Sequence, residues 1–218
     1  MPRRAALSAV LVIALGALWA AASPARHLPP PGHYVLAASR SQLSIHLYKS
    51  GWLSALGDNH LVVARRMRGV ADVAADQWSG VLVVPSRDLR VADPHRSAHD
   101  RAEIQATMDG PSQLDIARYP RITWRLDALG SAGGEGRMIL HGHFTMHGVT
   151  RRVDWRTHWA ATGDGIRLWG RAYLRLTSFG IHPIHRALGA VSVRNRFLLT
   201  WNTWWRHTGP AVAAAARK

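Results

Sequence analysis

An alternation of apolar and polar residues with a period of two runs through most of this 218-residue chain, and it restricts the fold more than any other feature. Successive side chains of a β-strand point to opposite faces, so the pattern predicts antiparallel strands with one buried and one solvated face. Segments 62–73 and 78–85 are weaker strand candidates. The clearest alternating segments are 41–48, 121–129, 151–159, 166–177 and 191–201.

The stretch HGHFTMHGVTRRVDW, which begins at His141, raises the question of a metal site. His141, His143 and His147 share one parity, and histidines at i and i+2 can share a metal ion, with Asp154 and His158 as further candidates. Arginines fill the same face of the other strands. We therefore interpret the histidines as part of a solvated outer face and expect no metal. The opposite parity is apolar or small throughout: Met138, Leu140, Gly142, Phe144 and Met146.

The beginning of the chain has the layout of an export signal. Two arginines precede an apolar run from Ala5 to Ala22, so we interpret residues 1–25 as a signal peptide. An uncleaved inner-membrane anchor is the alternative, because the run is almost long enough to span a bilayer. The sequence contains no cysteine, which excludes a lipoprotein anchor and disulfides. We expect a periplasmic protein with a Pro-rich spacer at 26–33 and a disordered tail at 207–218.

The formal charge of +15 comes almost entirely from arginine, since Lys49 and Lys218 are the only lysines. The arginines are dispersed in short groups rather than collected in one basic block. We expect weak association with an anionic membrane surface. Nucleic acid is not expected as the partner of an exported protein.

Residues 85–120 interrupt the strand pattern. The interval is polar, rich in Asp and Arg, and broken by Pro94 and Pro111. Within it, Ala98–Met108 is expected to form a short helix and Ser112–Ala117 a second one. The interval therefore predicts a helical excursion between two halves of a sheet.

About eight strands in one domain, which we place at residues 34–206, must protect their edges. Closure into a barrel removes the edges, so we predict an all-β fold, an antiparallel β-barrel with a short helical insertion. A barrel of this size is filled by side chains or holds one slender ligand. Tryptophans mix with Gly142, Gly170 and Ala172 on the inner parity, which leaves gaps for an elongated apolar guest. The alternative is a fully packed barrel.

Several segments together resemble a known family. They are Tyr34 with the strand around Ser44, GDNHLV before a strand ending at Gly69, DPHRSAHDRAEIQATMDGPSQLDIARYPRITW, LHGHFTMHGVTRRV and RLTSFGI. In this order and spacing they resemble a divergent branch of the YceI-like family of periplasmic lipid- and isoprenoid-binding proteins. The resemblance implies an extended lipocalin-like barrel whose lumen accepts an isoprenoid or other amphiphilic chain. It also implies neither a cofactor nor established catalytic residues.

Two groups of residues are candidates for a ligand site. Asp58, Asn59 and His60 form a polar group that would bind a ligand head at the barrel mouth, and the alternative is a hairpin turn, since Gly-Asp-Asn is common turn chemistry. The apolar candidates for the lumen are Leu43, Ile45, Leu47, Trp124, Phe144, Met146, Trp155, Leu174, Phe197 and Leu199.

The sequence favours binding without catalysis. It contains no Gly-x-Ser-x-Gly elbow, His-Glu-x-x-His pair or phosphate-binding loop. Asp58 and His60 could act in a hydrolytic triad only if folding brought a serine oxygen to His60. The alternative function is that of a packed envelope or stress protein that acts through protein partners. Whether the chain forms a homodimer is left open.

Overall fold

The computed structural model describes residues 28–50, 59–74, 78–186 and 191–211. Within these ranges, twelve strands form one antiparallel sheet, accompanied by a single α-helix. The predicted all-β fold is confirmed. The strands are β1 (Gly32–Leu36), β2 (Gln42–Ser50), β3 (His60–Ala64), β4 (Arg68–Val73), β5 (Trp78–Pro85), β6 (Leu89–Val91), β7 (Arg121–Ser131), β8 (Arg137–Met146), β9 (Val149–Thr162), β10 (Gly165–Arg175), β11 (His185–Arg186) and β12 (Val191–Gly209).

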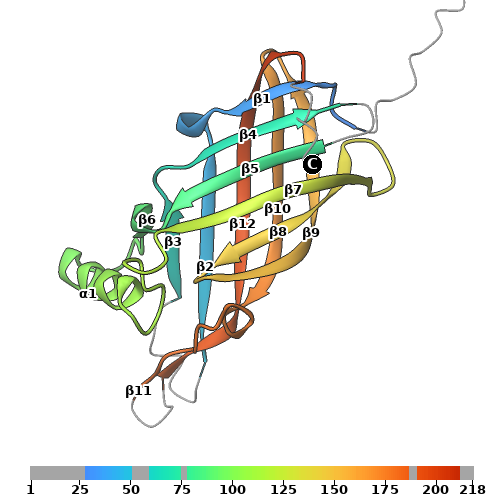
Figure 1. Cartoon of the computed structure of the whole chain (residues 1–218). Coiled ribbons are helices and arrows are strands. Elements are labelled where there is room, and N and C mark those ends of the chain that lie inside the picture. Colours follow the sequence, from blue (N-terminus) through green and yellow to red (C-terminus); the bar gives the residue numbers. More distant parts are fainter. Residues whose placement is uncertain (1–27, 51–58, 75–77, 187–190, 212–218) are drawn as a thin grey trace, which may run out of the picture.

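Eight of the strands close into a barrel (Figure 1). Their order around the ring is β1, β4, β5, β7, β8, β9, β10 and β12, and the pairing of β12 with β1 completes it. Strands β2, β3 and β6 continue the sheet from the side of β12, while β11 pairs with β12. The predicted strand number therefore matches the closed ring, and the further strands form an extension at one side.

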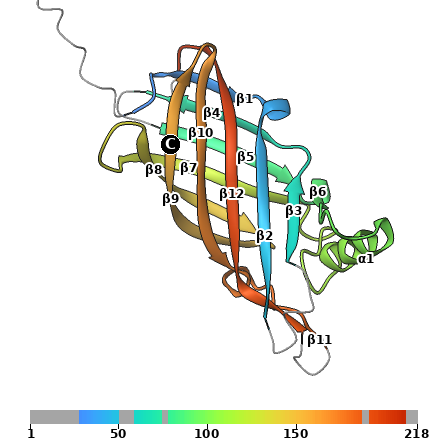
Figure 2. The same cartoon turned by 180° about the vertical axis from the view of Figure 1, so that it is seen from behind.

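The last strand, β12, joins the ring to its extension (Figure 2). One edge pairs with β10, while the other pairs first with β2 and then, from Trp205 onward, with β1. β12 ends at Gly209, three residues beyond the expected domain end at residue 206, and β1 begins at Gly32, within the expected spacer.

Tyr34 helps to hold the seam between β1 and β12. Its side chain is 2% exposed, its hydroxyl donates a hydrogen bond to the carbonyl oxygen of Pro30 over 2.8 Å, and its ring meets the edge of His207. Burial raises the pKa of the Tyr34 hydroxyl above its ordinary value. The hydroxyl is therefore held in its neutral, hydrogen-bonding form.

The expected alternation holds over most of the strands. The apolar parity of β8 is buried, as are Trp155 and Trp159 on β9 and Phe197, Leu199 and Trp201 on β12. On β10, Arg171 and Arg175 are exposed beside Tyr173, which is 50% exposed. The inner parity thus forms one apolar core inside the ring.

Ser192 departs from the alternation of segment 191–201, whose pattern places it with Arg194 and Arg196 on the solvated face. Ser192 is 7% exposed, and it lies where β12 is paired on both sides, with Ser50 of β2 and with His185 of β11.

His141 and His143 lie on the outer face, as expected. Nδ1 of His141 is 2.8 Å from Oδ1 of Asp154, and Nδ1 of His143 is 2.6 Å from Oδ2 of Asp127. Each histidine therefore has its own carboxylate. Among the described residues, no three His, Cys, Asp or Glu side chains gather where they could hold a metal ion.

His147 does not continue the outer face of β8, which corrects the expectation for this residue. It occupies the tight turn to β9 with φ +51°, followed by Gly148 with φ +72°. Two consecutive positive φ angles are what a two-residue hairpin of this twist requires. Nδ1 of His147 donates to the carbonyl oxygen of Phe179 over 3.0 Å.

The helical insertion contains one α-helix, α1 (Ala98–Asp109), which matches the first expected helix. The hydroxyl of Ser97 caps it by accepting a hydrogen bond from the N–H of Asp100. The expected helix at Ser112–Ala117 is wrong: the segment forms turns, and Asp115 has φ +43°, which no right-handed helix accommodates. No helix of the described part has the length and apolar character needed to cross a membrane.

Gly142 should be required for the register of β7 and β8. A Cβ atom there would lie 2.1 Å from the carbonyl oxygen of Arg125, a contact with rigid backbone. We expect Gly142→Ala to lower the free energy of unfolding by roughly 1–3 kcal/mol. Gly163→Ala is the control, because nothing lies within 4 Å of its added Cβ. Urea denaturation of both variants checks this, and equal stabilities would contradict it.

Candidate ligand-binding site

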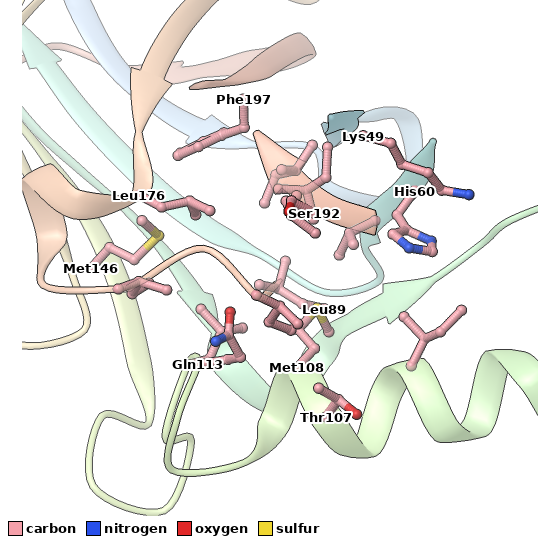
Figure 3. Close-up of a pocket in the computed structure, with 18 of the residues that line it drawn as sticks. Lys49, His60, Leu89, Thr107, Met108, Gln113, Met146, Leu176, Ser192 and Phe197 are labelled. Carbon is pink, nitrogen blue, oxygen red and sulfur yellow. The ribbon is translucent and has the colours of Figure 1, made fainter. Parts of the chain in front are cut away.

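A cavity of about 260 Å³ lies at the end of the barrel that α1 covers (Figure 3). It is lined by residues of β2, β3, β6, β8 and β12, of α1, and of the segments that follow α1 and β10. Most of its wall is apolar. The lining residues are Ile45, Leu47, Lys49, His60, Val62, Leu89, Glu103, Ile104, Thr107, Met108, Gln113, Leu114, Met146, Leu176, Ile181, Ile184, Ser192, Val193 and Phe197.

The side chain of Gln105 holds α1 against the sheet. Its Oε1 accepts a hydrogen bond from the N–H of Val91 over 2.9 Å, and its Nε2 donates to the carbonyl oxygen of Leu89 over 3.1 Å. The amide of Gln105 thus bonds backbone groups of β6 as a neighbouring strand would, and α1 covers the edge of the sheet that β6 forms. This attachment places Ile104 and Met108, which are four residues apart on the helix, at the cavity.

A second contact ties the loop after α1 to the segment after β10. Nε2 of Gln113 donates to the carbonyl oxygen of His182 over 3.2 Å. The neighbouring Ile181 is 2% exposed and, with Ile184, completes the cavity wall. The wall is therefore assembled from segments far apart in the sequence.

Six of the lining residues are polar: Lys49, His60 and Ser192 come from β2, β3 and β12, and Glu103, Thr107 and Gln113 come from α1 and the loop after it. We call Lys49, His60 and Ser192 the polar rim. Figure 3 shows Lys49 and His60 on one side of the cavity, with Leu176 and Met146 on the other. Lys49 is 9% exposed, so its stem packs within the protein. The rim could hold a polar head group while the remaining wall contacts an apolar chain.

His60 is fixed by a buried carboxylate. Its Nδ1 is 2.6 Å from Oδ2 of Asp93, whose side chain is 3% exposed. Oδ1 of Asp93 accepts the N–H of Leu61 over 2.6 Å, so both carboxylate oxygens are used. Because Nδ1 bonds the carboxylate, Nε2 is the ring nitrogen left for another partner.

Four aromatic residues, Trp124, Phe144, Trp155 and Trp201, form what we call the aromatic layer beyond this cavity. The ring of Trp155 lies 5.9 Å from that of Trp124, 5.7 Å from Phe144 and 4.8 Å from Trp201, between centroids. Strands β7 and β12 are four positions apart in the ring of eight, so the layer crosses the lumen from wall to wall. The indole N–H groups of Trp124 and Trp155 are buried without a hydrogen-bond partner among the described residues, so these rings contribute packing.

A smaller cavity of about 70 Å³ lies along the aromatic layer. It shares Ile45, Leu89, Met146 and Phe197 with the larger cavity, so the two spaces adjoin. The lumen therefore narrows sharply from the end covered by α1 toward the tryptophans.

Comparison with known proteins identifies the family. The model of the YceI-like domain matches residues 34–203. The chain belongs to the YceI-like family. This match confirms the resemblance that the sequence motifs indicate, and it covers the ring and its extension together.

The chain also resembles solved structures, of which one supports the same fold. The crystal structure of Burkholderia cenocepacia BcnA superposes with a TM-score of 0.62 at 13% identity, over 77% of this chain and 98% of that protein. The Campylobacter jejuni YceI protein gives a TM-score of 0.47 at 10% identity, over 67% and 84%. At these identities the likeness to BcnA concerns the fold alone. No curated protein matches the chain in sequence.

The apolar candidates in this YceI-like chain separate into three groups. Ile45, Leu47, Met146 and Phe197 line the larger cavity, and Leu174 lines neither cavity but packs against the core. The candidates that line only the smaller cavity are Leu43, Trp124, Phe144, Trp155 and Leu199. Ligand contact remains a prediction for all ten.

The polar candidates also separate. His60 lines the larger cavity, whereas Asn59 is exposed and its Oδ1 accepts the N–H of Lys49 over 3.3 Å, which joins β2 to the start of β3. Asp58 lies outside the described residues. Asn59 therefore supports the rim without lining the cavity.

The sequence reasoning missed the contribution of the insertion and of the segment after β10. Ile104 and Met108 are apolar residues at i and i+4 in an otherwise polar helix, and this spacing marks one helical face. That signal was available. No comparable signal marks Ile181 or Ile184, whose position depends on the path of the chain.

Asp93 should be important for the rim and for stability. In Asp93→Asn, the amide nitrogen or oxygen must face His60, and one of the two hydrogen bonds of the carboxylate is weakened or lost. We expect the free energy of unfolding to fall by about 1–3 kcal/mol. Asp127→Asn disturbs a half-exposed His–Asp pair, so its expected change is below ~1 kcal/mol. Chemical denaturation measures both, and similar losses would contradict the prediction.

Proposed function

We propose that this YceI-like protein binds an isoprenoid or other amphiphilic lipid in the larger cavity, without converting it, in the bacterial periplasm. The observation that carries the proposal is a 260 Å³ cavity with a mostly apolar wall and a polar rim on one side. A packed barrel that acts through protein partners would have no need of such a connected space. The volume is close to the lower end of ligand pockets, which run from roughly 300 to 1,000 Å³.

Burial of apolar surface supplies the affinity. At ~0.8 kcal/mol for each buried CH₂ group, one five-carbon isoprene unit would contribute roughly 3–4 kcal/mol as an upper limit. A chain of two such units can offset part of the cost of association, which is about 4–15 kcal/mol. The polar rim then sets the orientation, with the head near Lys49 and His60 and the tail toward the aromatic layer.

Binding without catalysis is supported by the hydrogen bonding of His60. Its described hydrogen-bond partner is the carboxylate of Asp93 rather than a serine oxygen. A nucleophile activated by His60 would need to lie within hydrogen-bonding distance of the ring. The family to which the chain belongs is a family of binding proteins.

The periplasmic location is supported by the sequence alone. Residues 1–25, which carry the export pattern, lie outside the described residues. The two arginines followed by an apolar run, and the absence of cysteine from the chain, favour export into a bacterial periplasm.

Weak association with anionic membrane surfaces is also part of the proposal. On the outside of β9, β10 and β12, His158 stacks on Trp169, and the guanidinium of Arg167 lies 4.9 Å from the rings of both Trp169 and Trp204. Arg40 lies over the other end of this group, 5.7 Å from Trp204. We call these five residues the outer ladder. Arginine and tryptophan together suit the head-group region of a membrane, and the charge of +15 favours anionic lipids.

The outer ladder can be tested with vesicles. We expect the protein to cosediment with phosphatidylglycerol vesicles at low salt but not with phosphatidylcholine vesicles. Arg167→Gln should weaken this binding by about 1 kcal/mol, beyond the effect of Arg152→Gln. Arg152 is an exposed arginine on β9 outside the ladder, so it controls for net charge. If the two variants weaken vesicle binding equally, the outer ladder has no specific role, and binding depends only on the net charge of the protein.

Ligand binding is tested by native mass spectrometry of the protein purified gently from an envelope fraction of cells expressing the full chain, followed by organic extraction. We expect an apolar adduct.

Leu47→Trp should fill the larger cavity and reduce geraniol affinity by about tenfold or more, because the equivalent of two buried CH₂ groups is lost. Tyr48→Trp, on the opposite face of β2, should leave it unchanged. A mass without adduct, together with no geraniol binding by the unmodified protein, would refute the proposed function.

A further inference from the structure

We infer that the site selects ligands with short tails, of about two isoprene units, because the aromatic layer narrows the lumen beyond the larger cavity. This inference rests on the proposed function and specifies the ligand class. The inference concerns how far a ligand tail can extend into the barrel lumen, which the tryptophans of this chain determine.

The volume of the cavity limits the size of the tail. An apolar cavity of roughly 150 Å³ binds benzene, which has six carbon atoms. In proportion, the 260 Å³ of the larger cavity corresponds to about ten carbon atoms. The smaller cavity of about 70 Å³ adds room for about three more. A tail that enters both spaces therefore has about ten to thirteen carbons.

The length of the cavity leads to the same limit. Along β2, the lining of the larger cavity runs from Lys49 at the rim through Leu47 to Ile45. The smaller cavity continues past Leu43 and, on β12, as far as Trp205, but its volume over that distance is only about 70 Å³. Four strand residues at ~3.3 Å each span roughly 13 Å. An extended peptide covers about 3.3–3.6 Å with three main-chain bonds, so 13 Å corresponds to about eleven single bonds. Two isoprene units contain eight to nine bonds along the chain, and four units contain about twice as many.

The aromatic layer is held too firmly to be displaced by a tail at little cost. Trp155 is 7% exposed and Trp201 is 8% exposed, and their rings are 4.8 Å apart. Trp201 also lies against the backbone of β10, since a Cβ added at Gly170 would be 2.4 Å from its Cζ2. Farther along β12, Trp205 also points inward and is 7% exposed, with Thr203 between it and Trp201 on the same face. A longer tail therefore has to remain outside the lumen, where its burial adds little.

The experiment measures affinity for prenyl alcohols of one, two, three and four isoprene units by isothermal titration calorimetry at concentrations below aggregation. The head group is the same throughout. We expect affinity to increase by about tenfold or more from one unit to two and to change by less than about threefold from two units to four. A continued rise up to four units would overturn the inference while leaving the proposed function intact. If no prenyl alcohol binds, the proposed function fails as well.

Trp201→Leu tests the cause of the limit. Trp201 lines the smaller cavity but not the larger one, so removing its indole widens the narrow part of the lumen, and the affinity for three units should rise relative to that for two. Trp204→Leu is the matched control: it is the same substitution three residues along β12, at an outward position in the outer ladder. Thermal unfolding verifies that each variant is folded. A folded Trp201→Leu variant that prefers the same tail length as the unmodified protein would contradict the inference. The titrations of the unmodified protein with prenyl alcohols of one to four units test the length limit without any substitution.

Discussion

The hydrogen bonding of both edges of β12 is the constraint on which the rest of the structure depends. One edge pairs with β10, and the other pairs with β2 and then with β1. This sharing closes eight strands into a ring and leaves β2 free to carry β3 and β6 away from it. The cavity lies where ring and extension separate, since its lining includes residues of β2, β3 and β6 as well as β8 and β12.

Two kinds of packing divide the interior. Toward one end, aromatic rings from opposite walls meet across the lumen and fill it. Toward the other end, aliphatic side chains and α1 enclose a space that they do not fill. A closely packed interior is stable in itself, whereas an apolar cavity forgoes contacts that a ligand can restore. The same barrel can therefore combine a rigid half with a half suited to a small guest.

The polar groups near the cavity serve to hold its wall in place. Gln105 fixes α1 to β6, and Asp93 fixes His60 at the start of β3. Both side chains bond backbone groups as well, which makes the helical insertion part of the sheet edge rather than a loose cover. The head of a ligand would thus meet a rim whose geometry is set before binding, which reduces the cost of ordering it.

The sequence by itself determined the all-β class, the strand faces, the first helix and the family, because period-two patterning and local motifs are encoded along the chain. It also located five of the cavity residues, Ile45, Leu47, His60, Met146 and Phe197. Tertiary structure decided the burial of Ser192 and the division of the tryptophans from the cavity. These features depend on which strands pair and on which strands face each other across the ring. Such relations join residues distant in sequence, and no local pattern carries them.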